Sequence, residues 1–245
     1  MIDTHAHLGE DASEVLARAR SVGVARIVVV ATTVAGAKAA LALADAEEGV
    51  YAALGIHPHE AGSAGPEDVE RLRVLLAHPK AVAVGETGLD HFRDYAPREA
   101  QRRLFEAQLA LAADTGKPVV IHTRDADDET FPMLEGAAVP VVLHCFSSPD
   151  RLDEAVERGY MMSFAGNVTY PNAAALQDAA KRVPKELLLA ETDSPYLAPV
   201  PMRGRRNRPA NVMHTLAFLA ALRETPPADL ERTIEANAAR VFGLP

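Results

Sequence analysis

Six histidine and carboxylate residues, spread along the whole chain, have side chains that bind divalent metals in proteins. They are His5, His7, Glu86, His122, His144 and Asp193. Imidazole nitrogens bind zinc and other first-row divalent ions, and carboxylates also bridge pairs of ions. Six ligands exceed the need of one catalytic tetrahedral ion, which keeps a position open for water or substrate. The set therefore predicts two ions about 3.5–4 Å apart, with Glu86 as the bridge.

A pair of such ions performs hydrolysis. It lowers the pKa of a bound water and clamps the attacking and leaving oxygens of a displacement. Three carboxylates are the expected catalytic residues: Glu86 as the bridge, Asp193 as the acceptor of the water's proton, and Glu191, which lies two residues before Asp193. Glu191 is expected to orient a ligand or relay a proton, and an ion pair in the protein core is its alternative role.

The elements that carry these residues are short apolar runs rich in valine, isoleucine and leucine, which are typical of buried strands. Eight such runs occupy residues 1–7, 26–32, 50–56, 81–86, 118–122, 140–144, 160–165 and 186–193. Stretches with helical periodicity lie between them, at 12–22, 35–48, 66–77, 97–115, 149–158, 172–182 and 211–223. The link at 124–135 has the weakest helical pattern.

This repeated alternation of strand and helix predicts an α/β fold with a parallel sheet. Eight such units in 245 residues indicate a (β/α)8 TIM barrel, with a doubly wound open sheet as the alternative. No GxGxxG follows the first run, so the dinucleotide-binding fingerprint is missing. We find no linker or break in composition, and we therefore expect residues 1–245 to form one domain.

The six candidate ligands stand at the ends of five of these strands. Side chains two residues apart on a strand point the same way, so His5 and His7 face one centre. In a closed barrel the C-terminal strand ends converge on one mouth, where active sites of this fold are built. A purely structural role, capping strands and binding backbone, fits any one of the six but does not explain their shared register.

Other residues are candidates for substrate contact at the same mouth. His57 follows the third strand and is expected to contact phosphate or a loosely held extra ion. Arg124 shares the face of His122 and has the guanidinium geometry that suits phosphate. Arg203 and Arg205 belong to the one dense basic loop of the chain, for which a solvated surface loop is the alternative. Phe92, Tyr196 and Phe146 are aromatic side chains that could stack on bases, although core packing is the favoured role for Phe146.

Composition restricts the class of protein. The apolar content of 48% allows a sizeable core, and no apolar run reaches the roughly 20 residues that span a bilayer. The start of the chain has no basic region followed by an apolar stretch, so we expect no secretory signal. The single cysteine, Cys145, fits a reducing cytoplasm. The formal charge of −9 argues against a protein that coats nucleic acid through broad electrostatic attraction. It permits an enzyme that binds a few phosphates through metal ions and local arginines.

Eight sequence blocks give the chain a specific family resemblance. They are DTHAHL, GIHPH, VGETGLD, IHTRDA, LHCFS, SFAGNVTY, LLAETDSPYLAP and PMRGRRNRP. In this order and spacing the chain resembles the TatD family of metal-dependent deoxyribonucleases, within the amidohydrolase-like barrels. The resemblance implies a DNase with 3′→5′ exonuclease activity. It also implies that His5, His7, Glu86 and Asp193 hold one metal, and that Glu86, His122 and His144 hold the second.

The chain departs from the family pattern at positions outside this ligand set. His91 and Phe92 follow GLD, where the family often has two aromatic residues. Ser148 replaces a glycine that usually follows LHCFS, and Arg208 stands where the family commonly has glutamate. Related phosphotriesterase-like enzymes use a carboxylated lysine as the metal bridge, whereas this chain has Glu86.

The sequence thus predicts a cytoplasmic hydrolase that cleaves phosphodiester bonds at single-stranded DNA ends with two divalent ions. Zinc, manganese and magnesium all fit the ligand chemistry. No membrane association or obligate protein partner is expected. The first alternative keeps the metal centre and changes the substrate to a lactone, amide or phosphotriester, because a fold does not fix a substrate. The second alternative is a non-catalytic binding protein on a barrel scaffold.

Overall fold

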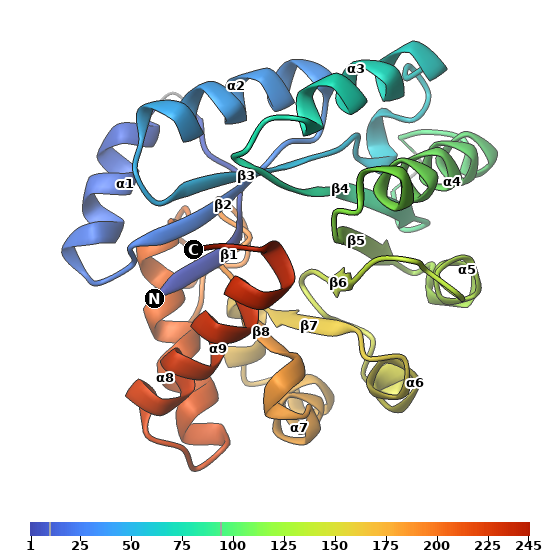
Figure 1. The fold of residues 1–245 in the computed structure, drawn as a ribbon. Helices are drawn as coiled ribbons and strands as arrows, with labels where there is room; N and C mark the ends of the chain where they lie inside the picture. Colours follow the sequence, from blue (N-terminus) through green and yellow to red (C-terminus); the bar gives the residue numbers. More distant parts are fainter. Residues whose placement is uncertain (10, 94) are drawn as a thin grey trace. The chain divides into compact units, whose positions relative to one another are not determined.

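The computed structural model describes residues 1–9, 11–93 and 95–245. In these residues eight parallel strands alternate with helices, and the strand order in the sheet follows the sequence from β1 to β8 (Figure 1). This is the order of a (β/α)8 fold, so the predicted fold class is confirmed. The chain divides into two compact units. Unit 1 comprises Met1–Val29 with His144–Pro245, and unit 2 comprises Val30–Leu143. The expectation of a single domain stays a prediction.

Unit 1 combines elements from both ends of the chain. Its strands are β1 (Ile2–Ala6), β2 (Arg26–Val30, of which Val30 belongs to unit 2), β7 (Met161–Phe164) and β8 (Leu188–Ala190). Its helices are α1 (Ala12–Ser21), α6 (Leu152–Glu157), α7 (Ala174–Arg182), α8 (Val212–Leu222) and α9 (Pro227–Phe242). Four 3₁₀ turns lie at Pro149–Arg151, Gly166–Thr169, Lys185–Leu187 and Pro209–Asn211. Strand β1 pairs with β2, and β7 pairs with β8.

Unit 2 is a continuous stretch of strand–helix repeats. Its strands are β3 (Val50–Leu54), β4 (Ala81–Asp90), β5 (Val119–Arg124) and β6 (Val141–Leu143). Its helices are α2 (Val34–Ala46), the 3₁₀ turn η1 (Pro58–Glu60), α3 (Pro66–Leu76), α4 (Arg98–Thr115) and α5 (Asp127–Met133). Consecutive strands of this unit pair in parallel, and α3 packs between α2 and α4 (Figure 1). Among the described residues, no helix has the length and hydropathy needed to cross a membrane.

Strand β4 is the longest strand and carries polar groups into the interior. All ten of its residues are buried, including Glu86, Thr87 and Asp90. The sequence predicted that this strand ends at Glu86, but it continues to Asp90. Buried carboxylates are costly unless they are hydrogen-bonded or bind a cation, so their presence here marks a functional region.

Strand β8 and helix α9 also differ from the sequence expectation. The eighth strand was predicted to reach Asp193, but it ends at Ala190, and Asp193 has a left-handed backbone with φ of 51°. A strand cannot include that conformation.

Helix α9 was not predicted, although the sequence contains its signals. Pro227 occupies the first turn, and Gly243 follows the last turn with φ of 62°. Its buried residues Leu230, Ile234 and Ala238 repeat every four positions. The amino group of Met1 lies 2.7 Å from Glu231 and 3.1 Å from Glu235, both on α9. The last helix therefore fixes the start of β1.

Gly55, directly after β3, allows the backbone to approach the residue before Glu86. A Cβ at Gly55 would lie 2.5 Å from the carbonyl carbon of Gly85 and 2.6 Å from its Cα. We therefore expect Gly55→Ala to lower stability by about 1–3 kcal/mol, which is a fall in Tm of about 2–12 °C for a chain of this size.

Thermal unfolding followed by circular dichroism measures this change. Gly62→Ala is the matched control, because the nearest atom to its Cβ would be 3.7 Å away, which is ordinary contact. Equal Tm values for the two variants would contradict the packing argument.

Candidate functional site

In unit 1, hydrogen bonds between β1 and the segment after β8 bring His5, His7 and Asp193 together. The Asp193 backbone N–H donates to the His5 carbonyl at 3.0 Å, and the His7 N–H donates to the Ser194 carbonyl at 2.8 Å. Ala6 and Ser194 form a parallel bridge. These bonds hold the C-terminal end of β1 against the turn in which Asp193 lies.

Asp3 secures the same junction from inside the protein. Its buried carboxyl group accepts hydrogen bonds from the Thr192 hydroxyl at 2.6 Å and from the backbone N–H groups of Thr192 and His5 at 2.8 and 3.3 Å. Burial raises the pKa of Asp3 to about 8, against the lowering effect of these hydrogen bonds. Asp3 therefore has a structural role beneath the two histidines.

The resulting cluster in unit 1 has the donor atoms of a metal site. The Nε2 atoms of His5 and His7 are 3.3 Å apart, and Asp193 Oδ1 lies 4.0 Å from His5 Nε2 and 3.6 Å from His7 Nε2. The three ligand atoms lie within 4.8 Å of one another. His5 is fully buried, whereas the side chains of His7 and Asp193 are 22% and 13% exposed. The cluster is thus open to small molecules on the side of His7.

His144 and Glu191 lie beside this cluster in unit 1. The His144 ring stacks on His5, with centroids 3.9 Å apart. Glu191 Oε1 meets His144 Nδ1 at 3.1 Å and accepts the backbone N–H of Cys145 at 2.9 Å. The structure thus places Glu191 behind His144, in contact with its ring. Because β8 ends at Ala190, Glu191 lies just outside the strand.

In unit 2, a second cluster forms around His122 between two carboxylates. Its Nδ1 lies 2.8 Å from Glu86 Oε1, and its Nε2 lies 3.2 Å from Asp90 Oδ2. His59 Nε2 lies 2.8 Å from the same Asp90 oxygen. Burial acts to raise the pKa of Asp90, but hydrogen bonds from His122, the Arg93 backbone and His59 hold it well below its usual value. Asp90 is therefore ionised and accepts a hydrogen bond from each ring.

His57 is fixed in one tautomer by its own turn. The backbone N–H of His59 donates to His57 Nδ1 at 3.1 Å, so this nitrogen carries no proton. Burial lowers the pKa of His57 against the opposing effect of Glu86, which keeps the ring neutral. The proton is then on Nε2, which lies 3.3 Å from Glu86 Oε1. Although His57, Glu86 and His122 are close enough to hold an ion, this geometry favours His57 as a hydrogen-bond donor.

The residues of both clusters fit divalent metal ions. Each cluster combines imidazole nitrogen with a carboxylate oxygen, the donor set of zinc and manganese sites. In unit 1, Glu191 Oε2 is buried and has no hydrogen-bond partner among the described residues. An uncompensated buried carboxylate oxygen is expensive, and a nearby cation removes that cost. The ligand assignments themselves stay predictions.

The arginines predicted to contact substrate differ in their surroundings. Arg124 is exposed and lies over the Phe92 ring, 3.8 Å from its centroid. In the basic loop, Arg203 lies 4.4 Å from the centroid of Tyr170, and Arg205 is exposed with no ion-pair partner among the described residues. The remaining two arginines of this loop face α1: Arg206 is 3.8 Å from Asp11, and Arg208 is 3.5 Å from Glu14. Arg208, which stands where the family commonly has glutamate, thus forms an ion pair with Glu14.

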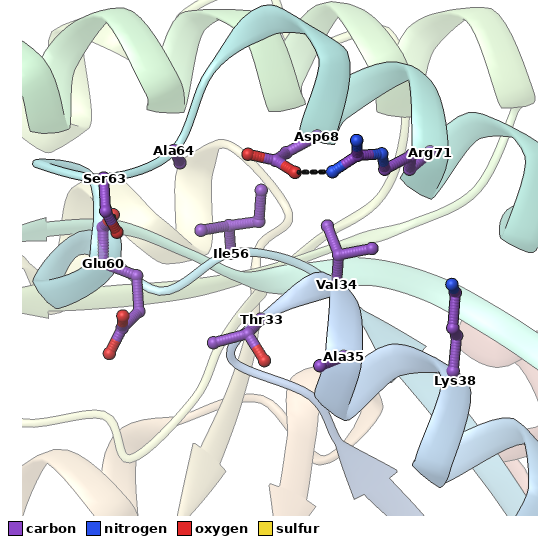
Figure 2. Close-up of a pocket in the computed structure, with 10 residues that line it drawn as sticks. All are labelled: Thr33, Val34, Ala35, Lys38, Ile56, Glu60, Ser63, Ala64, Asp68 and Arg71. Carbon is purple, nitrogen blue, oxygen red and sulfur yellow. Dashed lines mark hydrogen bonds and ion pairs between the residues drawn. The ribbon is translucent and has the colours of Figure 1, made fainter.

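A separate cleft of about 510 Å³ lies in unit 2, between the start of α2 and the segment from η1 to α3 (Figure 2). Ten residues line it: Thr33, Val34, Ala35, Lys38, Ile56, Glu60, Ser63, Ala64, Asp68 and Arg71. Asp68 and Arg71, both on α3, pair at its rim at 2.8 Å. None of the ten belongs to the histidine–carboxylate clusters, so this cleft is distinct from the candidate metal ligands.

The sequence did not predict Asp90 or His59 as residues of the site. The signal for Asp90 was its spacing: Glu86, Gly88 and Asp90 alternate on one face if the strand continues. Ending the predicted strand at Glu86 hid this relation. The contact of His59 with Asp90 had no local signal, because the two residues are 31 positions apart.

Known proteins are similar to this chain along nearly its whole length. A family model described as TatD related DNase matches residues 2–243. The metal-dependent hydrolase YabD of Bacillus subtilis is 38% identical over 253 residues, which cover 100% of this chain and 99% of YabD. The 3′-5′ ssDNA/RNA exonuclease TatD of Klebsiella pneumoniae is 35% identical over 250 residues, 98% of this chain and 95% of the exonuclease. The crystal structure of YJJV, a TatD homologue of Escherichia coli, matches with a TM-score of 0.94 at 34% identity, over 100% of this chain and 98% of YJJV.

Asp90→Asn tests whether this carboxylate sets the tautomer of His122. Asparagine keeps an acceptor for the backbone N–H groups of Phe92 and Arg93, which bind Asp90 Oδ1 at 3.0 and 2.9 Å. It places an amide donor opposite His122 Nε2, which forces the proton onto Nδ1, the atom that faces Glu86. We expect one metal-binding event to weaken by about 10- to 100-fold.

Isothermal titration with Mn²⁺ or Zn²⁺ measures this affinity. Asp68→Asn is the matched control, because Asp68 accepts a backbone N–H and pairs with an arginine without touching a histidine of the cluster. If Asp90→Asn binds both metals as the unaltered protein does, Asp90 does not orient His122.

Proposed function

Since this chain belongs to the TatD-related DNase family, we propose that it is a metal-dependent hydrolase that removes nucleotides from the 3′ ends of single-stranded DNA. The observation that carries the proposal is the largely buried histidine–carboxylate cluster in each unit. The family relation supports phosphodiester hydrolysis, and the name of the Klebsiella relative supports single-stranded nucleic acid as the substrate. The single cysteine supports a reducing compartment, the cytoplasm, as the place of action.

We assign two divalent ions to the protein, one for each cluster. In unit 1, His5, His7 and Asp193 would hold an ion, with the stacked His144 ring beside them. Unit 2 would hold the other ion through Glu86 and His122. Bound divalent ions supply an activated water at neutral pH and neutralise charge on a phosphate. Zinc, manganese and magnesium are the candidates.

Side chains of the protein orient the metal ligands and accept the proton of the attacking water. Asp193 Oδ1 is the proposed proton acceptor for the attacking water, because its side chain is partly exposed and lies beside His7. Glu191 holds His144 through Nδ1, so that the ring keeps one orientation. Asp90 does the same for His122 through Nε2. Glu86 receives contacts from both His57 and His122, which fixes its carboxylate.

Phosphate contacts come from side chains with exposed or fixed donors. The Nε2–H group of His57 can donate a hydrogen bond to a phosphate oxygen as well as to Glu86. Arg124, Arg203 and Arg205 are exposed guanidinium groups, which bind phosphate through paired N–H donors. Local cations of this kind are needed because the chain as a whole carries a formal charge of −9.

Turnover of end-labelled single-stranded DNA tests the proposal. We expect shortening of the labelled strand from its 3′ end with Mn²⁺, Zn²⁺ or Mg²⁺, loss of activity in chelator, and recovery when the ion is restored. A lactone, an amide and a phosphotriester belong in the same panel. Turnover of one of these, with DNA intact, would replace the proposed substrate. Metal binding without turnover of any substrate would favour a binding protein.

Glu86→Gln and Asp193→Asn are expected to lower kcat by about 10²- to 10⁴-fold, because each replaces a carboxylate that holds an ion or accepts a proton. His78→Ala is the control. It removes a half-buried histidine that pairs with Asp45 at 3.3 Å before β4 begins, outside both clusters. Undiminished turnover in Glu86→Gln or Asp193→Asn would contradict the assignment of that residue.

A further inference from the structure

Two aromatic side chains are exposed in the segment that follows β4 in unit 2. Among the described residues, the exposed large apolar side chains are Val74, Phe92, Tyr95, Tyr196 and Val200. Phe92 is 54% exposed and Tyr95 is 64% exposed. By contrast, the ring of His91 is 9% exposed and lies beside Glu129. A single exposed apolar residue needs no explanation, but two large rings within four positions form a patch that suggests a ligand.

The patch carries two guanidinium groups close to its rings, one of them stacked. Arg124 lies over the Phe92 ring at 3.8 Å from the centroid, and Arg93 lies 5.4 Å from Phe92 and 5.8 Å from Tyr95. Stacking against a ring limits the conformations of the Arg124 side chain, so it loses less entropy when it binds a phosphate. The surface therefore pairs flat apolar rings with phosphate-binding donors.

Hydrogen bonds fix this patch next to the cluster of unit 2. The backbone N–H groups of Phe92 and Arg93 donate to Asp90, the carboxylate that also contacts His122. Tyr95 meets the His59 ring edge-to-face, with centroids 4.8 Å apart, and His59 binds the same aspartate. One buried carboxylate thus positions both the aromatic segment and a candidate metal ligand.

We propose that Phe92 and Tyr95 form a stacking surface for the bases of a single-stranded nucleic acid, with Arg124 bound to a phosphate between them. The inference rests on the proposed function and names how the same site holds its substrate. Unpaired bases have open π-faces, which bind aromatic side chains without regard to sequence, whereas a duplex hides them. Stacking has particular value here, because an acidic chain gains little from general attraction to phosphate.

Steady-state kinetics with an intact and an abasic oligonucleotide test the proposal. We expect Phe92→Ala and Tyr95→Ala each to raise the KM for an intact 12-mer by about 5- to 100-fold. The unaltered protein should show the same rise when the bases near the 3′ end are absent, and the alanine variants should show no second rise. Phe92→Tyr and Tyr95→Phe keep the rings and should keep the low KM. Val74→Ala removes an exposed side chain of α3 and should leave the KM unchanged.

Direct binding separates this inference from the proposed function. Fluorescence anisotropy with labelled oligo(dT) in chelator, where no hydrolysis occurs, gives Kd for each variant. Weaker binding by the alanine variants supports stacking even if the protein hydrolyses no DNA, which would refute only the proposed function. DNA hydrolysis with unchanged KM and Kd in both variants would overturn the stacking surface. So would binding to anionic phospholipid vesicles that depends on Phe92 while DNA binding does not.

Discussion

The candidate metal clusters depend on one constraint: a carboxyl group buried on a parallel strand must receive its hydrogen bonds from the protein, because water does not reach it. Asp90 at the end of β4 meets this constraint with two backbone N–H groups of the following segment and two histidine rings. Asp3 in β1 meets it with a hydroxyl and two backbone N–H groups. In unit 2, the hydrogen bonds to Asp90 also position the rings of His122 and His59. In unit 1, the hydrogen bonds to Asp3 also position the backbone of His5.

The pKa values of the two aspartates are shifted in opposite directions, and this difference separates their roles. Burial acts to raise the pKa of Asp90, but hydrogen bonds from His122, the Arg93 backbone and His59 together outweigh it and hold the pKa low, so Asp90 is an anion that orients rings. Burial outweighs the hydrogen bonds at Asp3 and raises its pKa to about 8, so it acts as a structural link between β1 and the segment after β8. Each cluster therefore has its own anchor: Asp90 orients histidine rings electrostatically in unit 2, and Asp3 links two segments structurally in unit 1. Each anchor reduces the motion of the candidate ligands in its own unit before any substrate binds.

Much of the fold was predictable from local sequence patterns. The apolar runs located all eight strands, and helical periodicity located α1 to α8, because burial on a strand or helix face repeats at a fixed spacing. The errors arose at element ends. Continuation of β4 to Asp90 and termination of β8 at Ala190 depend on neighbouring strands and on a left-handed Asp193, neither of which a strand pattern contains. Helix α9 was omitted despite clear terminal signals at Pro227 and Gly243.

The sequence by itself determined which side chains with metal-binding chemistry stand at strand ends, because residue type and strand periodicity are both local properties. The tertiary structure alone decided how those side chains are used. It selected the tautomer of His57, placed Asp90 against His122 across 32 positions, and left Phe92 and Tyr95 exposed beside them. Protonation, orientation and exposure depend on partners that are distant in the chain, and only folding brings those partners within hydrogen-bond reach.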